Sequence, residues 1–174
     1  MVQVDAFSPK NTIVITGDPS VYYVDGQINH DSFDRFLEAV TNNKKLKTIV
    51  LNSYGGYVLY AQLMMGIIRV YHLDTRVDPG MKCMSACVLL FQGGVHRIAS
   101  DDATFMLHPV KVQVEKHWVR NVIATNKFYA WLIRYGFHPG AADRVRKNKE
   151  VYFGAQAALD YGLATEIRGK FRKK

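Results

Sequence analysis

The amino-acid sequence predicts an α/β fold with a largely parallel sheet. Short segments rich in β-branched and aromatic residues alternate along the chain with segments of helical periodicity, and the connections between them are short. Glycines stand where several of these segments end. The 174 residues show no internal repeat, low-complexity tract or linker, so we expect a single domain over residues 1–174.

The first half of the chain is predicted to hold two strands, each followed by a helix. In order, these are strand 21–24, helix 32–41, strand 48–52 and helix 57–72. Phe33, Phe36 and Val40 fall on one face of the first helix. Asp25-Gly26 and Gly55-Gly56 are expected to end the two strands.

The second half continues the alternation. We predict strand 75–78, a short apolar helix that opens at Ser85, strands 96–99 and 103–107, helices 115–135 and 139–147, strand 151–153, helix 155–161 and strand 163–167. Gly136 and Gly162 follow two of the helices, as C-terminal capping glycines do.

Composition excludes some classes of protein. Apolar residues make up 48% and charged residues 22%, as in a globular protein. The longest apolar run, 83–91, is too short to span a bilayer, and the first residues lack the pattern of a secretory signal. We therefore expect a cytoplasmic protein without membrane contact.

The chain carries a net charge of +8, from 23 basic and 15 acidic residues. Five of the basic residues crowd the end of the chain: Arg168, Lys170, Arg172, Lys173 and Lys174. Such a tail can bind nucleic acid, but no nucleic-acid-binding motif accompanies it, and a solvated terminus is the preferred interpretation. We expect no nucleic-acid partner.

Two cysteines, Cys83 and Cys87, are four residues apart on a predicted helix. A structural zinc site needs four ligands, so the pair predicts no metal centre. A disulfide one turn apart on a helix would constrain little, and a reducing compartment disfavours it. We interpret both as small buried residues beside Ser85.

Ser85 is the candidate nucleophile. It stands at the predicted start of a helix, where free backbone amides and the helix dipole stabilise negative charge on an oxygen. Gly56 stands at a similar strand-to-helix turn. Because sites in parallel α/β sheets form beyond the carboxyl ends of strands, both turns are expected at one rim of the sheet.

His108 is the candidate general base. A serine hydroxyl needs a neighbouring base, and the pKa of histidine suits that role near neutral pH. Of the six histidines, only His108 ends a predicted strand that follows the Ser85 helix, and Pro109 keeps the chain extended there. The competing histidines are His30, His72, His96, His117 and His138.

An acyl-transfer site also needs oxyanion donors and a group that orients the histidine. The backbone amides of Ala86 and of Gly56 (or Gly55) are the candidate donors, since fixed amides stabilise the anion without reorganising. Glu150 is the first candidate for orienting His108, followed by Asn148 and then Asp143. This chemistry needs no cofactor or metal ion.

Four segments resemble the Clp protease proteolytic subunit (ClpP) and its superfamily. They are the turn 52–56 (Asn-Ser-Tyr-Gly-Gly), the nucleophile segment 83–87 (Cys-Met-Ser-Ala-Cys), the strand 105–109 (Phe-Met-Leu-His-Pro) and the segment 155–163. The resemblance covers residues 21–167, in the family's order. Tyr54 replaces the family's usual proline, and Ala86 replaces its methionine.

The resemblance implies a ClpP/crotonase-like spiral of β-β-α units with a protruding helical handle. Residues 1–20 would be an N-terminal segment, 111–136 the handle region and 168–174 a basic tail. It also implies a serine endopeptidase with a Ser85–His108–Glu150 triad, or Asn148 as third member. The subunits would form homo-oligomers, as heptameric and possibly stacked rings, around peptide or unfolded-protein substrates. The resemblance also implies an AAA+ unfoldase partner, but residues 1–20 give no clear match to the family's axial loop, which counts against a conventional one.

Two alternatives from the same superfamily remain open. One is a catalytically silent ClpP-like assembly subunit, motivated by the uncertain third residue. The other is a crotonase-type enzyme acting on acyl-CoA thioesters through paired amides, which would not need a serine–histidine pair. A nucleic-acid-binding module would rest only on the basic tail.

Overall fold

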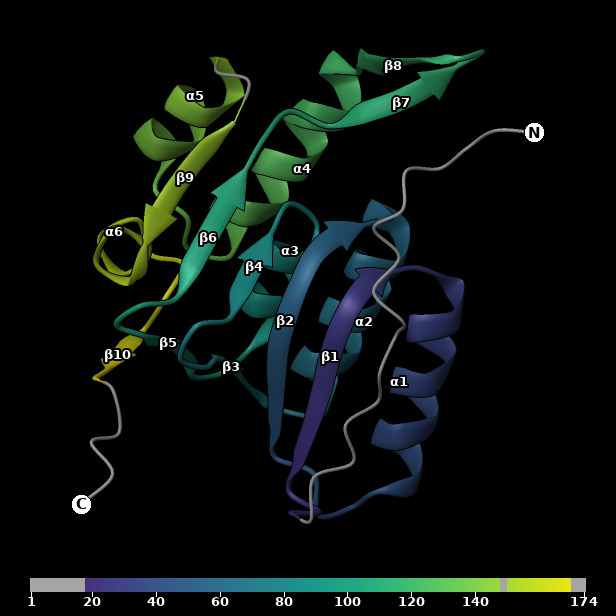
Figure 1. The fold of residues 1–174 in the computed structure, drawn as a ribbon, viewed down its shortest axis with the longest axis vertical. Coiled ribbons are helices and arrows are strands. Elements are labelled where there is room, and N and C mark those ends of the chain that lie inside the picture. The colour runs from purple at the N-terminus through teal and green to yellow at the C-terminus, as the bar shows by residue number, and fades with distance from the viewer. Residues whose placement is uncertain (1–17, 148–149, 170–174) are drawn as a thin grey trace.

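A computed structural model describes residues 18–147 and 150–169, in which strands and helices alternate (Figure 1). In chain order the elements are β1 (Val21–Ile28), α1 (His30–Asn42), β2 (Thr48–Gly56), α2 (Val58–Val70), β3 (Asp74–Val77), β4 (Lys82–Met84), α3 (Cys87–Gly93), β5 (Arg97–Ser100), β6 (Thr104–Leu107), β7 (Lys111–Val114), β8 (His117–Arg120), α4 (Val122–Arg134), α5 (Pro139–Lys147), β9 (Val151–Gly154), α6 (Ala155–Asp160) and β10 (Glu166–Arg168).

Strand β2 organises the main sheet. It pairs in parallel with β1 from the Val21–Thr48 pair to the Ile28–Gly56 pair. Its other edge pairs first with β3 and then, at Ser53, with β4. The sheet therefore divides into two arms along β2. One arm continues from β3 to β5 and β10, and the other continues from β4 to β6 and β9. Within the described residues, β9 and β6 form the one antiparallel pair of this sheet.

Helices α1, α2 and α3 cover one side of this sheet (Figure 1). Helix α1 begins with a capping box, in which the side chains of Asn29 and Ser32 each accept from the other's backbone amide. Every residue of α3 is buried. This buried helix starts two residues after Ser85, so the predicted nucleophile is anchored to the most enclosed part of the described structure.

The handle region differs from the prediction. The sequence predicted one helix over 115–135, but the structure has a β7–β8 hairpin followed by helix α4. Val112 pairs with Val119, and Gln113 with Trp118. β-Branched and aromatic residues, such as those in 117–120, favour a strand when a partner strand lies beside them. The partner here is 111–114, for which the sequence predicted neither strand nor helix. The hairpin extends beyond the end of β6, whereas α4 runs back toward the body and contributes Phe128, Tyr129 and Leu132 to the core (Figure 1).

The α/β prediction with a largely parallel sheet is confirmed, and helix 139–147 has the predicted bounds. The main omission is β4, a three-residue strand directly before Ser85. Residues 1–17 and 170–174, which include most of the predicted N-terminal segment and basic tail, lie outside the described residues, so the division of the chain stays a prediction. Among the helices of the described residues, none has the length and hydropathy needed to cross a bilayer.

Candidate active site

Ser85 occupies a tight turn between a strand and a helix. Strand β4 ends at Met84, helix α3 begins at Cys87, and the backbone of Ser85 adopts a left-handed conformation with φ of +56°. Such a conformation costs a non-glycine residue about 1–2 kcal/mol. Two hydrogen bonds hold it: the Ser85 amide donates to Met106 O at 2.7 Å, and the Val88 amide donates to Ser85 O at 3.0 Å. Strained residues held this way are concentrated at functional sites.

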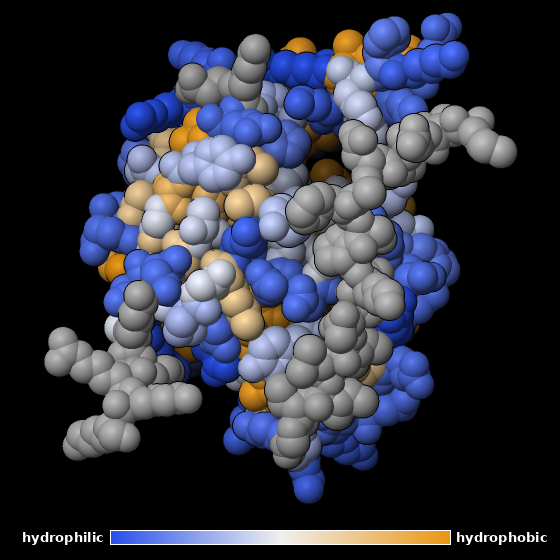
Figure 2. Space-filling view, in the orientation of Figure 1, coloured by the Kyte–Doolittle hydropathy of each residue, from blue (hydrophilic) through white to orange (hydrophobic). Residues whose placement is uncertain are grey.

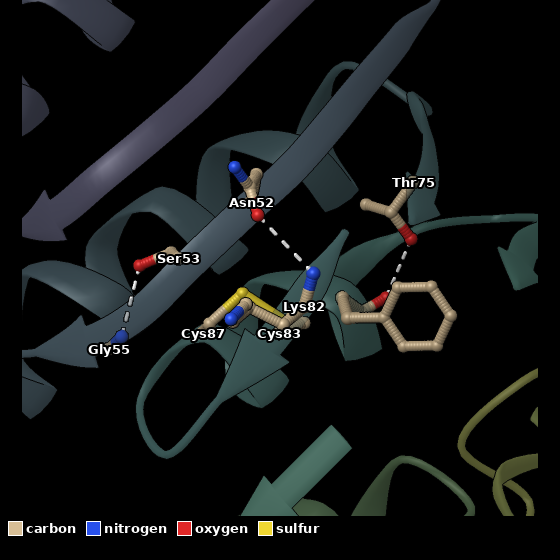
Figure 3. Close-up of a disulfide and its surroundings, with 8 residues drawn as sticks. Asn52, Ser53, Gly55, Thr75, Lys82, Cys83 and Cys87 are labelled. Atoms are coloured by element: carbon tan, nitrogen blue, oxygen red, sulfur yellow. Dashed lines mark hydrogen bonds between the residues drawn. A yellow bond between two sulfur atoms is a disulfide. The ribbon is translucent and has the colours of Figure 1, made fainter. Parts of the chain in front are cut away.

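A disulfide joins Cys83 to Cys87 (Figure 3). Ser85 is the middle residue of the five that this bond closes into a ring. The prediction of two free thiols on one helix was wrong. Cys83 lies in β4 and Cys87 is the first residue of α3, so the bond links a strand to a helix across the turn. We expected such a bond to constrain little because both cysteines were predicted on consecutive turns of one helix. That reason no longer holds, because Cys83 lies in strand β4 and not in the helix.

The predicted oxyanion segments lie against this turn. An added Cβ on Gly55 would stand 2.8 Å from Ser85 Cβ, 2.7 Å from Met84 O and 3.0 Å from Ala86 N. The backbone of Gly55 thus packs directly on the Ala86 amide, and only glycine fits there. Gly55 is itself held by the Ser53 hydroxyl, which accepts from the Gly55 amide (Figure 3). Gly56 follows with φ of +150° and is exposed, at the end of β2.

His108 follows β6, the strand beside β4. Met84 and Met106 form the last pair between β4 and β6. Ser85 is one residue after Met84 and His108 is two residues after Met106, so both follow the same end of two neighbouring parallel strands. Nδ1 of His108 lies 2.7 Å from Pro109 O. Because a carbonyl oxygen can only accept, Nδ1 carries the proton in the neutral ring and Nε2 is left as the free acceptor.

Helix α4 fixes the backbone around His108, an arrangement that the sequence did not predict. The Tyr129 hydroxyl donates to His108 O at 3.2 Å. Burial raises the pKa of Tyr129, so this phenol stays protonated as a donor. One turn earlier, Thr125 Oγ1 accepts from the Val110 amide at 3.0 Å. Only the fold shows this, because in the sequence Tyr129 resembles any other core aromatic residue.

Ser85, Gly56 and His108 line one cavity of about 250 Å³. Its other walls are Tyr54, Val58, Val110, Lys111, Trp118 and Phe128. Figure 2 shows a recess on this face of the molecule, near the top of the view. Most of the described residues that line the cavity are therefore aromatic or apolar, and they are joined by the ammonium group of Lys111, the hydroxyl of Ser85 and the imidazole of His108. Trp118 and Lys111 come from the β7–β8 hairpin, which the sequence did not predict.

Of the three candidates for orienting His108, the two that the structure describes, Glu150 and Asp143, bond to other groups. Glu150 precedes β9, the strand next to β6, but its carboxylate accepts from the Tyr152 hydroxyl at 3.2 Å. Asp143 pairs with Arg146 on α5. Asn148 lies outside the described residues. The group at His108 Nδ1 is instead the Pro109 carbonyl.

Compared by sequence, the chain matches no protein-family model and no curated protein. Compared by structure, it is similar to the ClpP catalytic domain from Plasmodium falciparum, with a TM-score of 0.70, 16% identity and coverage of 86% of this chain and 84% of that one. ClpP1 from Listeria monocytogenes gives a TM-score of 0.70 at 15% identity, over 88% of this chain and 93% of that one. The chain has the ClpP fold.

A membrane-bound stomatin-specific protease is similar as well, with a TM-score of 0.69 at 17% identity over 85% of this chain and 78% of that one. The predicted ClpP resemblance and fold class are thereby confirmed. At these identities the likeness concerns the path of the backbone. The roles of Ser85, His108 and Glu150 stay predictions.

Proposed function

We propose that the protein is a serine endopeptidase that cleaves peptide bonds through an acyl-enzyme. The observation that carries the proposal is the cavity that Ser85 and His108 share, with Ser85 on a left-handed turn whose next amide, that of Ala86, lies against Gly55. A hydroxyl, a basic nitrogen and fixed backbone amides around one space are the parts that acyl transfer needs.

In the proposed mechanism His108 Nε2 accepts the proton of Ser85 Oγ as the hydroxyl attacks the substrate carbonyl. The amides of Ala86 and Gly56 donate to the oxyanion, and each such donor contributes about 3 kcal/mol. His108 then returns the proton to the leaving amine, and water hydrolyses the ester by the same steps in reverse. The Pro109 carbonyl holds the required tautomer, a role that a carboxylate has in the usual triad.

The proposed substrates are peptides or unfolded chains, and the proposed assembly is a homo-oligomer of ring form. Large exposed apolar side chains support an assembly. They occur on α2 and on the handle region, and include Leu59, Leu63, Val70, Trp118, Val119, Val122 and Ile123. Exposed apolar surface of this kind is typical of interaction sites. Sedimentation velocity would give the number of subunits, and a monomer at all concentrations would contradict this part.

Labelling with a fluorophosphonate probe tests the chemistry. We expect the intact protein to react at one site, Ser85→Ala to lose the label entirely, and His108→Ala to react at least about 10²-fold more slowly. Matched controls are Ser20→Ala and His96→Ala. They remove a hydroxyl before β1 and an exposed imidazole beside Asp74, both at the end of β2 opposite Gly56. Absence of label on the assembled wild-type protein would contradict the proposal.

A catalytically silent assembly subunit is the second candidate. One observation favours it: the Glu150 carboxylate bonds Tyr152, and a peptide carbonyl stabilises an imidazolium less than a carboxylate does. A silent subunit would assemble but neither label nor turn over peptides. A crotonase-type enzyme would instead bind acyl-CoA in a titration calorimeter.

A further inference from the structure

A covalent ring of five residues surrounds the proposed nucleophile. The disulfide joins Cys83 to Cys87, and Met84, Ser85 and Ala86 lie between them. Both cysteines are fully buried, as is Ala86, whose amide is a proposed oxyanion donor. We propose that the Cys83–Cys87 disulfide positions Ser85 and the Ala86 amide, and that its reduction disables the nucleophile. This inference rests on the proposed peptidase function.

The disulfide links β4 to α3, and the relative placement of these two elements determines the shape of the Ser85 turn between them. Cys83 is fixed in the sheet between Ser53 of β2 and Phe105 of β6. Cys87 starts α3, which is buried along its whole length. The distance between the cysteine Cα atoms is 5.2 Å, and the left-handed Ser85 lies at the centre of that span. The disulfide therefore adds a covalent link across a turn that two backbone hydrogen bonds also hold.

Reduction changes the space that the sulfurs need. Two unbonded thiols cannot approach as closely as two bonded sulfur atoms. A close-packed core has few voids into which the separating sulfur atoms could move. The surroundings leave little freedom: even one methyl group added to Gly55 would overlap Met84 O and Ser85 Cβ. We infer that β4 and the start of α3 separate, and that the shift falls on the Ser85 turn between them.

The effect is local rather than global. In the chain-entropy account the stabilisation that a disulfide gives increases with loop length, and five residues form a very short loop. A misplacement of the reacting atoms of about 1 Å, by contrast, lowers a rate about 10²-fold. Loss of reactivity with little loss of fold is therefore the signature that separates a positioning role from a merely structural one.

The reductant is a dithiol of the class that cells and laboratories both use. One of its thiolates attacks a disulfide sulfur and forms a mixed disulfide, and its second thiol then displaces the protein sulfur. Two electrons and two protons pass to the protein, which gains two thiols, while the dithiol becomes a cyclic disulfide. An oxidised dithiol reverses each step. Because both cysteines are buried, the exchange is expected to be slow and to need a local opening.

The test compares fluorophosphonate labelling of the oxidised and the dithiol-reduced protein, with thiols counted by mass spectrometry. We expect a labelling rate at least about tenfold lower after reduction, restored by reoxidation, with unchanged far-ultraviolet circular dichroism. The double variant Cys83→Ala/Cys87→Ala should match the reduced protein and ignore the reductant. Ser20→Ala, with its disulfide intact, should respond as the wild type does. Equal rates within about twofold would overturn the inference.

A second measurement does not depend on reactivity. Native-state hydrogen exchange should accelerate on reduction for amides within 82–92 but not for those of β1, residues 21–28. If the oxidised protein takes no label, the peptidase proposal fails, and the exchange data still decide the positioning role. Unchanged exchange within 82–92 in a protein with two free thiols would overturn that role as well.

Discussion

The two walls of the cavity are built in opposite ways. On one wall, Ser85 lies between buried residues and is held by backbone hydrogen bonds and a disulfide. On the other wall, strand β8 of the hairpin is exposed along its length, and Trp118 keeps 67% of its surface accessible. The difference indicates a division of labour. A fixed wall suits chemistry that tolerates little displacement, and an exposed wall suits contact with substrates of varied sequence.

The strongest test of the fixed wall is Gly55→Ala. The new methyl group would overlap Met84 O and Ser85 Cβ at a position with φ of +98°, so we expect at least about 10²-fold slower labelling and about 1–3 kcal/mol lower stability. Labelling kinetics and urea unfolding measure the two effects.

Gly66→Ala is the matched control for that substitution. Gly66 lies inside α2 with open space around its Cα, so alanine should raise stability by up to about 1 kcal/mol and leave labelling unchanged. If Gly55→Ala behaves like Gly66→Ala, the close packing against Ser85 has no functional meaning.

Tyr129→Phe tests how firmly the base is held. Removing the hydroxyl leaves His108 O without that donor, which costs about 1–3 kcal/mol, and should slow labelling about tenfold. Tyr152→Phe removes an exposed hydroxyl instead and serves as the control. Wild-type labelling in Tyr129→Phe would show that α4 does not position the histidine.

Trp118→Ala tests the exposed wall. We expect stability to change by less than about 0.5 kcal/mol, because the side chain is largely exposed. The KM for peptides should rise about threefold to tenfold while kcat stays within about twofold, since lost uniform binding affects KM alone. A fall in kcat with unchanged KM would place the hairpin in the chemical step and would weaken the contrast between the walls.

Glu150→Gln is expected to have the smallest effect. The carboxylate bonds Tyr152 and not His108, so labelling should stay within about twofold of wild type. Loss of about 10²-fold or more would instead show that Glu150 turns onto the imidazole during reaction, as the usual triad requires. That outcome would assign the orienting role to the Glu150 carboxylate and would contradict the proposed role of the Pro109 carbonyl at His108 Nδ1.

Much of the framework could be predicted from local sequence. Strand–helix alternation placed Gly56 and Ser85 at strand-to-helix turns and His108 after a strand, and the structure has all three there. Prediction failed where a segment's structure depends on a distant partner. Residues 117–120 are a strand because 111–114 lie beside them, and 82–84 are a strand because β2 and β6 flank them.

The sequence by itself determined the α/β class, the order of the elements apart from β4 and the hairpin, and the segments that carry the hydroxyl, the imidazole and the glycines. These follow from periodicity and from residue conformational preferences, which act over a few neighbours. Tertiary structure alone decided that Cys83 and Cys87 bond across a strand–helix turn, that Tyr129 holds the backbone of His108, and that a carbonyl faces its Nδ1. The relative placement of separate elements decides each of these contacts, and it depends on how the whole core packs.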